Sequence, residues 1–356
     1  MSDFDMRSAN IVEIEQLMHN IGEKPYRAAQ IFDWLHGKFA AGYDEMTNLP
    51  AALRAKLAQI AAISPVECAR IQKSSDGATR KYLFNLQNNG IMDKKATYVE
   101  TVLMTYRHGL SICVSSQAGC RMGCDFCASG QTGLERNLTA GEIAAQYYAV
   151  CRDIGQRIGN VVIMGSGEPL DNYDNTLKFI GLISDKKGAN VGARHITVST
   201  CGIVPRIYDL ARENLQITLA VSLNAPNDQI RRRLMPIARK YDIDTLLTAC
   251  RAYADAKRRI SFEYIMLDGV NDGEGNAKEL AKRLAGIKCH VNLIAANKVP
   301  EKGYNRSNAA VITRFAEILE KSGVDVTIRR EMGSDISAAC GQLRNQHGQQ
   351  VSEEAK

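Results

Sequence analysis

The feature that most constrains the fold is a regular alternation of short β-branched runs with longer helical stretches, beginning near residue 110 of the 356-residue chain. The runs that we predict as strands are 110–115, 160–164, 195–199, 216–222, 260–266 and 290–294. The clearest helical pattern between them, 139–152, opens with Thr139 and Glu142 in capping-box spacing. Such alternation requires right-handed crossovers and predicts an α/β fold with a parallel sheet. Periodicity alone leaves open whether that sheet closes into a barrel.

The first 95 or so residues have a different pattern. Residues 27–38 place Ile31, Leu35 and Phe39 at helical spacing, and a second helix, 51–60, follows Pro50. Segments 79–86 and 97–105 alternate like paired strands around a turn-rich stretch. We therefore expect an N-terminal accessory domain over 1–95 with a helical unit and a short hairpin, a core over 96–345, and a polar tail over 346–356.

Composition excludes several classes of protein. With 45% hydrophobic and 24% charged residues, the chain is neither disordered nor fibrous. No apolar run approaches the roughly 20 residues that span a bilayer, and the acidic start does not fit a signal peptide. We expect a cytoplasmic protein without a membrane partner. The net charge of +6 permits a nucleic-acid partner without requiring one.

Small and polar residues follow the predicted strands. They include Gly165 to Pro169 after the second strand, Thr200 to Gly202 after the third, Ser222 to Asn224 at the end of the fourth, Asp268 to Asp272 after the fifth, and Asn297 after the sixth. In parallel α/β proteins, the carboxyl ends of the strands form the site. We expect the functional site at this edge.

Three cysteines follow the first of these strands in the spacing C-x3-C-x2-C: Cys120, Cys124 and Cys127. A structural zinc site usually takes four protein ligands in two separated pairs, and no fourth Cys or His stands nearby at that spacing. Three cysteines suit a [4Fe–4S] cluster that keeps one iron open to an exogenous ligand. We interpret Cys68, Cys151, Cys250 and Cys289 as small packing residues, and favour core packing for Cys201.

With Phe126 before its last cysteine, the motif resembles the signature of the radical SAM enzymes, which bind S-adenosylmethionine (SAM) at the open iron. Further stretches resemble the RlmN/Cfr family of radical SAM enzymes, which methylate adenine in RNA, and are closest to its RlmN branch: 113–117, 165–172, 222–228, 329–333 and 340–343. The resemblance covers nearly the whole chain. It implies a partial (β/α)6 barrel with the N-terminal helical accessory domain.

The resemblance also implies a covalent mechanism. Cys340 would take a methyl group from one SAM, and a second SAM would supply the 5′-deoxyadenosyl radical that activates this methyl group. Cys113 would then release the methylated base by forming a transient disulfide with Cys340, and Glu100 would accept the ring proton. The target would be carbon 2 of an adenine in 23S rRNA, in the peptidyl-transferase region, and of the adenine beside the tRNA anticodon.

We expect SAM to be bound by residues at the strand ends, namely Gly167, Glu168, Ser199, Ser222, Leu223, Asn224 and Asn297. Gly167 would let the backbone approach the ligand, and Glu168 would accept from the methionine ammonium group. The sequence departs from the RlmN pattern at three positions: Ser166 replaces a common methionine, Asn224 a frequent histidine and Ala295 a usual proline.

Two basic clusters are candidates for RNA contact: 231–233 with 239–240, and 282–283 with Lys288. We favour phosphate contact for the first, which follows a strand end, and leave the second open between RNA contact and a solvated face. Basic residues of the N-terminal unit could dock folded RNA by shape: Arg27, Lys38, Arg54 and Lys56. The target base would have to leave its stack. We further expect a monomer that receives electrons from a flavodoxin or ferredoxin system.

Three alternatives remain open at this point. The nearest is Cfr-type methylation of adenine carbon 8, which confers antibiotic resistance and uses the same cysteines. A non-catalytic RNA-binding protein with structural zinc would contain no iron. A radical SAM enzyme acting on peptides or small molecules would leave Cys340 and the N-terminal unit unexplained.

Overall fold

The computed structural model describes residues 4–86, 96–131, 133–255, 259–296, 303–329 and 332–336. The chain falls into two compact units. The first contains residues 1–118, 136–165 and 172–196, and the second contains 119–135, 166–171 and 197–356. None of the described helices is both long enough and apolar enough to cross a membrane.

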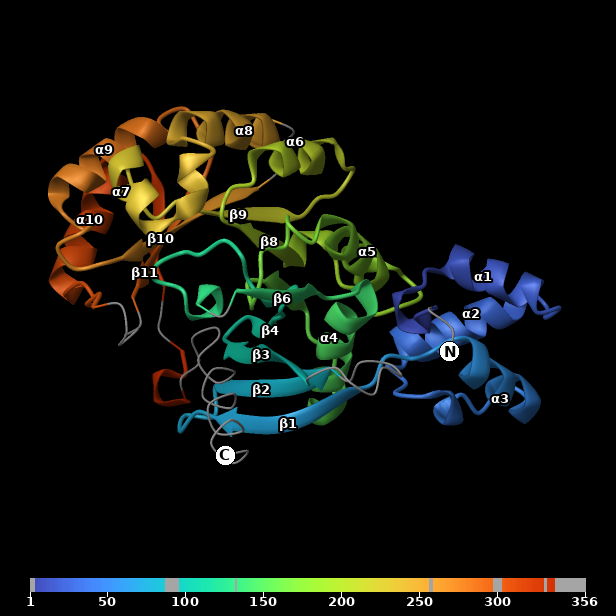
Figure 1. Cartoon of the computed structure of the whole chain (residues 1–356). Helices are drawn as coiled ribbons and strands as arrows, with labels where there is room; N and C mark the ends of the chain where they lie inside the picture. The colour runs from blue at the N-terminus through green and yellow to red at the C-terminus, as the bar shows by residue number, and fades with distance from the viewer. Residues whose placement is uncertain are drawn as a thin grey trace. The chain divides into compact units, whose positions relative to one another are not determined.

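The first unit combines N-terminal helices with a mixed sheet. Its helices are α1 (Ile11–Asn20), α2 (Tyr26–Phe32), α3 (Ala51–Ile60), α4 (Ala140–Ile154) and α5 (Tyr173–Ser184). Its strands are β1 (Val66–Lys73), β2 (Thr79–Leu86), β3 (Thr97–Tyr106), β4 (Gly109–Cys113) and β7 (Asn160–Ile163), and they adjoin in that order. Strands β1 to β4 are antiparallel neighbours, whereas β4 and β7 are parallel. Figure 1 shows α1, α2 and α3 gathered together in blue.

The second unit contains the alternating part of the chain. Its strands are β8 (Ile196–Thr200, which begins at the boundary), β9 (Thr218–Ser222), β10 (Ile260–Met266), β11 (His290–Ala295) and β12 (Asp325–Ile328), all parallel and adjoining in chain order. Its helices are α6 (Val204–Arg212), α7 (Asp228–Leu234), α8 (Ile243–Asp255), α9 (Glu274–Leu284) and α10 (Ala309–Lys321). In Figure 1, α8, α9 and α10 lie along the outside of β9 to β11. The short strands β5 (Gln117–Gly119) and β6 (Leu134–Asn137) pair with each other at the unit boundary.

These elements confirm the predicted α/β alternation. Each of the six predicted strands is present, and α4 begins at Thr139 with the expected capping box to Glu142. The predicted hairpin is β2 paired with β3, from Thr79 opposite Met104 to Leu86 opposite Thr97. Its turn lies outside the described residues. The sequence pattern missed α1, β1 and β12; the two strands are mostly exposed and lack a regular buried alternation.

The predicted helix over 27–38 is confirmed, with one difference. After α2, residues Asp33–Gly37 form a π-helical turn, and Phe39 then has a positive φ of 63°. Ile31 and Leu35 are fully buried, as their spacing predicts, and Phe39 is also buried. In this turn His36 bonds to the hydroxyl of Tyr148 through Nδ1 at 2.7 Å, which attaches the N-terminal helices to α4.

The cysteines expected to pack in the core divide into two groups. Cys151, Cys201 and Cys250 are buried and Cys289 is half-buried, as a packing role requires. Cys68 is exposed, so its prediction was wrong. Its strand β1 is the outermost of its sheet and exposes most of its side chains, which explains why Cys68 does not reach the core.

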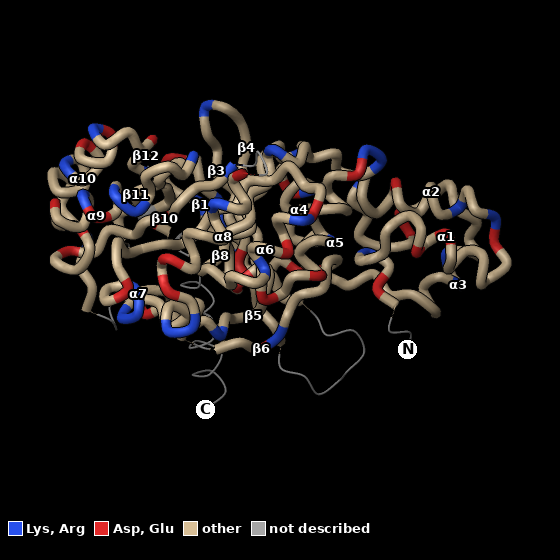
Figure 2. Tube along the Cα trace, turned by 90° about the horizontal axis from the view of Figure 1, so that it is seen from above, with Lys and Arg blue, Asp and Glu red and all other residues tan. Residues whose placement is uncertain are grey.

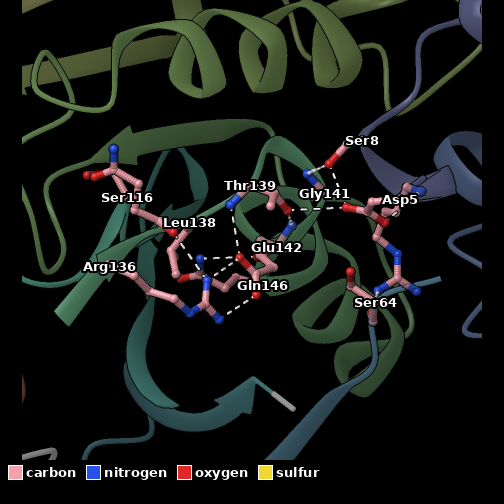
Figure 3. A network of polar contacts seen from close by, with 12 residues as sticks. Asp5, Ser8, Ser64, Ser116, Arg136, Leu138, Thr139, Gly141, Glu142 and Gln146 are labelled. Atoms are coloured by element: carbon pink, nitrogen blue, oxygen red, sulfur yellow. Dashed lines mark hydrogen bonds and ion pairs between the residues drawn. The ribbon is translucent and has the colours of Figure 1, made fainter. Parts of the chain in front are cut away.

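The beginning of α4 fixes the N-terminal segment to the core of the first unit. The Thr139 hydroxyl donates to Asp5 at 3.2 Å, and the Gly141 N–H donates to the Ser8 hydroxyl at 2.8 Å. Arg136 forms two hydrogen bonds with Glu142 at 2.6 and 2.7 Å (Figure 3). A Cβ atom at position 141 would lie 2.5 Å from Asp5 Oδ2 and 2.8 Å from Ser8 N, so only glycine permits this approach.

One turn further along α4, Gln146 holds the segment that leads into the cysteine motif. Its side chain accepts from the Ser115 N–H and donates to the Ser115 carbonyl, both at 2.9 Å. The Ser115 hydroxyl in turn donates to the Glu100 carbonyl at 2.6 Å. Helix α4 therefore fixes both the N-terminal segment and the chain between Cys113 and Gln117.

Candidate functional site

The three-cysteine motif forms a tight loop in the second unit. The Cys120 N–H bonds to the Gly133 carbonyl at 2.9 Å, and the Cys127 N–H bonds to the Cys124 carbonyl at 3.1 Å. Gly123 has a φ of +64°, a conformation that favours glycine. The Asp125 N–H donates to the Leu234 carbonyl at 2.9 Å and so attaches the loop to the end of α7.

Burial dominates the electrostatics of this loop. Burial raises the pKa of Cys120 to about 12, and the Cys127 thiol adds to the increase. Burial also raises the pKa of Cys124, as do Cys127 and Cys120. Thiolate is the form that binds metal, so a metal bound here would have to stabilise the deprotonated cysteines.

Within the described ranges, no three His, Cys, Asp or Glu side chains converge on a position for a single metal ion. None of the three motif cysteines forms a disulfide within the described part of the chain. Three thiols are the donor set that suits an iron–sulfur cluster with one iron left open.

Glu168 is buried between two backbone segments at the strand ends. Its Oε2 accepts from the Cys201 N–H at 2.7 Å and its Oε1 from the Leu170 N–H at 3.0 Å. Burial raises the pKa of Glu168, although its hydrogen bonds to Cys201 and Leu170 act in the opposite direction. The preceding Gly167 has a φ of +105°, as its predicted role in backbone approach allows.

The remaining strand-end predictions have different environments. Ser199 on β8 and Ser222 at the end of β9 are half-buried, whereas Leu223 is buried. Asn224 is also buried and has a φ of +58°, which asparagine tolerates better than most residues. Its side chain accepts from the Ile265 N–H at 2.9 Å and donates to Met235 Sδ at 3.4 Å. Asn224 therefore ties β9 to β10 in this structure.

Arg231 corrects the prediction that its basic run contacts phosphate. Its side chain is 0% exposed, and its guanidinium donates to the Cys201 carbonyl at 2.7 Å and the Leu223 carbonyl at 3.3 Å. The α7 helix turns Arg231 inward because this position shares a face with Leu234. Arg232 and Arg233 are exposed, so their contact with RNA stays a prediction. Figure 2 shows blue, which marks Lys and Arg, at α7.

The other basic candidates make local contacts. Lys38 pairs with Asp33 at 2.9 Å and lies over the Trp34 ring, and Arg283 pairs with Asp244 at 2.7 Å. The Arg54 and Lys56 side chains donate to backbone carbonyls, and Arg27 donates to Gln30. These contacts leave the expected role of each residue in RNA binding untested.

Glu100 and Cys113 lie in the first unit. Glu100, on β3, pairs with Lys81 of β2 at 3.0 Å, and both side chains are buried. Cys113, the last residue of β4, packs in a small core with Val102 and Met104. Sequence reasoning missed Lys81, because it follows Arg80 in 79–86 and its charge alone gives no signal of a buried ion pair.

Two expected residues, Cys340 and Asn297, lie outside the described residues. Two other contacts near the motif were not anticipated. Arg121 pairs with Asp171, and the Tyr304 hydroxyl donates to Asp125 at 2.7 Å. No sequence pattern indicates these pairs, because they join residues about 50 and 180 positions apart.

Comparison with known families defines the class of protein. Residues 114–281 match the radical SAM superfamily, and residues 4–63 match the "Ribosomal RNA large subunit methyltransferase N-terminal domain". A crystal structure of a radical SAM methyltransferase from Sphaerobacter thermophilus superposes with a TM-score of 0.90 at 45% identity, covering 95% of this chain and 98% of that one. The α/β fold predicted from the sequence is therefore the radical SAM fold, with an N-terminal domain.

Two curated relatives identify the family to which the chain belongs. A protein of Lachnospira eligens, named "Probable dual-specificity RNA methyltransferase RlmN", is 48% identical over 98% of both chains. A protein of the same name from Lachnoclostridium phytofermentans is 50% identical over 96% of this chain and 95% of its own. The chain belongs to the RlmN family of radical SAM RNA methyltransferases. Membership implies a [4Fe–4S] cluster, SAM and an RNA substrate.

Proposed function

We propose that this enzyme methylates carbon 2 of adenine in 23S rRNA, in the peptidyl-transferase region, and in tRNA next to the anticodon. The nearly full-length similarity to proteins named dual-specificity RlmN carries this proposal. The N-terminal match over residues 4–63 supports rRNA as one substrate. The expected accessory domain over 1–95, core over 96–345 and tail over 346–356 form part of the proposal.

In this proposal Cys120, Cys124 and Cys127 hold the cluster. When bound, the cluster supplies the electron that cleaves SAM, and two molecules of SAM are used per turnover. The buried carboxylate of Glu168 binds the methionine ammonium group. The other proposed SAM contacts are Gly167, Ser199, Ser222, Leu223, Asn224 and Asn297.

Two thiols and a carboxylate perform the remaining chemistry. Cys340 Sγ would carry the methyl group as a thioether. Loss of one hydrogen atom from that group to the 5′-deoxyadenosyl radical would give 5′-deoxyadenosine and let the carbon bond to the adenine ring. The Glu100 carboxylate would accept the proton from carbon 2, and the remaining electron would return to the cluster. Cys113 Sγ would then attack the sulfur of Cys340, so that an S–S bond forms as the S–C bond breaks, and a proton would complete the methyl group on the base. An external thiol reduces this disulfide, as a cytoplasmic location would allow.

The partners follow from the same proposal. Arg232 and Arg233 on α7, with the basic residues of the N-terminal unit, would contact RNA phosphates, and the target adenine would leave its stack. A flavodoxin or ferredoxin system would supply the electrons, and the enzyme would act as a monomer. The proposal includes no membrane partner.

The direct test uses anaerobically reconstituted protein with SAM, a reductant, and either a 23S rRNA fragment or tRNA. Nucleosides are then identified by mass spectrometry. We expect 2-methyladenosine in both RNAs. Formation of 8-methyladenosine would instead establish the Cfr-type reaction, and protein containing zinc without iron or labile sulfide would contradict the radical mechanism.

Three cysteine variants separate the proposed roles. Cys340→Ala should abolish methyl uptake by the protein, because the carrier thiol is lost. Cys113→Ala should still form the carbon–carbon bond but remain covalently attached to RNA. Cys68→Ala, at an exposed thiol on β1, is the matched control and should behave like the parent enzyme. Release of methylated RNA by Cys113→Ala at the parental rate would refute the resolving role.

A further inference from the structure

Among the described residues, the buried guanidinium of Arg231 bonds to neutral groups. The side chain is 0% exposed. Its hydrogen bonds within this part of the chain go to four carbonyls, those of Cys201, Ser222, Leu223 and Tyr241. A buried charge is expensive unless an opposite charge compensates it, so an anionic group should lie nearby.

The bonds of Arg231 join the ends of two neighbouring strands. Nη2 donates to the Cys201 carbonyl, after β8, and more weakly to the Ser222 carbonyl, at the end of β9. Gly202 makes this approach possible, since a Cβ atom there would lie 3.2 Å from Nη2 and 2.9 Å from Leu246 Cδ1. The guanidinium group presents several N–H donors in one plane, which suits such a set of carbonyls. A lysine would offer only a single compact ammonium group.

The backbone N–H of Cys201, unlike its carbonyl, bonds to Glu168. The Cys201 N–H donates to Glu168 Oε2 at 2.7 Å, while the Cys201 carbonyl accepts from Arg231 at the same distance. Arg231 therefore sets the position of a residue that orients the proposed ammonium-binding carboxylate. A displacement of Cys201 would move an N–H group that donates to Glu168.

The surroundings of Arg231 include two cysteines. Burial lowers the pKa of Arg231, whereas Cys201 and Cys124, the central cysteine of the motif, oppose this effect. The cysteine loop packs against the same part of the unit, because Met122, Cys124 and Phe126 contact the core formed by Cys201, Leu234 and Met235. Leu234 belongs to the same short helix as Arg231 and accepts the Asp125 N–H.

We propose that Arg231 is a positioning residue with two effects. Its guanidinium N–H groups hold the ends of β8 and β9 that bind SAM, and its positive charge is the buried counter-ion of the thiolate-ligated cluster. The assignment rests on the proposed placement of the cluster at Cys120, Cys124 and Cys127. A fixed positive charge beside a thiolate ligand favours uptake of an electron, because net charge and surrounding dipoles set the potentials of such clusters.

The test compares three variants of the full-length, anaerobically reconstituted enzyme. Arg231→Met removes both the positive charge and the planar set of N–H donors, whereas Arg231→Lys keeps the charge and loses that set of donors. Arg232→Met is the control, because it removes an exposed charge from the same helix. Each protein is assayed for iron and sulfide, for the one-electron midpoint potential in a dithionite titration followed by electron paramagnetic resonance, and for SAM affinity.

We expect Arg231→Met to lower the equilibrium constant for electron uptake about tenfold, which corresponds to about 59 mV for one electron. Arg231→Lys should keep the parental potential but bind SAM about tenfold more weakly, as loss of a charged hydrogen-bond donor predicts. Arg232→Met should keep the parental potential, because water screens its charge.

A parental potential in Arg231→Met with full cluster content would overturn the counter-ion assignment, and parental SAM affinity in Arg231→Lys would overturn the positioning assignment. If Arg231→Met fails to retain iron, Arg231→Lys decides alone: a lowered potential in this charged variant overturns the counter-ion role, and a parental one supports it. A parent enzyme without iron and sulfide would defeat the proposed function as well.

Discussion

The run Arg231 to Arg233 shows how neighbouring residues of one type acquire different roles. In the sequence the three arginines are equivalent members of a basic cluster. In the structure Arg231 is buried beneath the strand ends, while its two neighbours are exposed. The difference comes from the helical rotation of about 100° per residue, which places only one of three consecutive positions on the inner face. Charge patterning alone could not assign that face, because α7 is a short helix with few apolar positions.

The buried pair of Lys81 and Glu100 gives a prediction for stability. Lys81→Met should lower the free energy of unfolding by about 3–5 kcal/mol, because it leaves the Glu100 carboxylate buried without its cation. The measurement is urea unfolding of the parent and the variant at pH 7.

The control for this prediction is the double variant Lys81→Met/Glu100→Gln, which removes both charges. It should recover a large part of the lost stability, because no uncompensated charge remains. A loss below about 1 kcal/mol in Lys81→Met alone would mean that Glu100 is stabilised by other groups.

At the scale of single elements, the start of α4 is the clearest case of sequence and structure agreeing. Thr139 and Glu142 predict the helix start, and both sides of the capping box are formed. The sequence does not predict that the same helical turn is the docking point for Asp5 and Ser8, more than 130 residues earlier. That contact depends on Gly141, and a glycine in a helix more commonly indicates only a weak position.

Replacing Gly141 should therefore be unfavourable even though alanine is the better helix former. Gly141→Ala places a methyl group against Asp5 and Ser8 and should lower the free energy of unfolding by about 1–3 kcal/mol. The matched control is Gly181→Ala in α5, where a Cβ atom meets nothing within 4 Å. This exposed position should gain about 0.5–1 kcal/mol. Equal effects of the two substitutions in urea unfolding would contradict the close approach at Gly141.

The π-helical turn after α2 should make stability depend on pH through His36. Burial, with a further contribution from the Arg7 charge, lowers the pKa of His36 to about 3. Between pH 6.5 and this value the unfolded chain binds a proton that the folded protein excludes, so stability falls as the pH falls. From pH 7.0 to pH 5.5 the loss due to His36 should be about 1 kcal/mol.

This pH dependence can be isolated by comparison with a variant that cannot titrate. His36→Gln should lose about 1 kcal/mol less than the parent between the same two pH values, whatever its stability at pH 7. Parallel behaviour of the two proteins in urea unfolding at pH 7.0 and 5.5 would show that His36 is not buried in its neutral form.

At the scale of the whole molecule, the sequence was most informative where a short motif or a long periodicity carried the signal. The six strands, the helix 139–152 and the three-cysteine loop could all be read locally. The roles proposed for Cys340 and Cys113 could not, because an isolated cysteine on a strand or beside alanines has no distinctive pattern. They required the family resemblance, and the curated relatives support that resemblance over 98% of the chain.

The residues of the proposed mechanism belong to both compact units. The proposed base Glu100 and thiol Cys113 belong to the first unit, whereas the cysteine loop and the strand ends belong to the second. Long-range pairs such as Lys81 with Glu100, or Asp125 with Tyr304, arise from the fold and have no spacing that a sequence pattern could detect. Their residues become interpretable only when packing reveals which polar groups are buried together.

The single guanidinium shared by β8 and β9 has a consequence for engineering. An enzyme is ordinarily engineered to accept a bulkier sulfonium analogue by substituting the residues of one side of the pocket at a time. Here a substitution that shifts the end of β8 also pulls on the end of β9, because both carbonyl groups bond to Arg231. Productive libraries should therefore vary the two strand ends together and keep Arg231 and Gly202 constant.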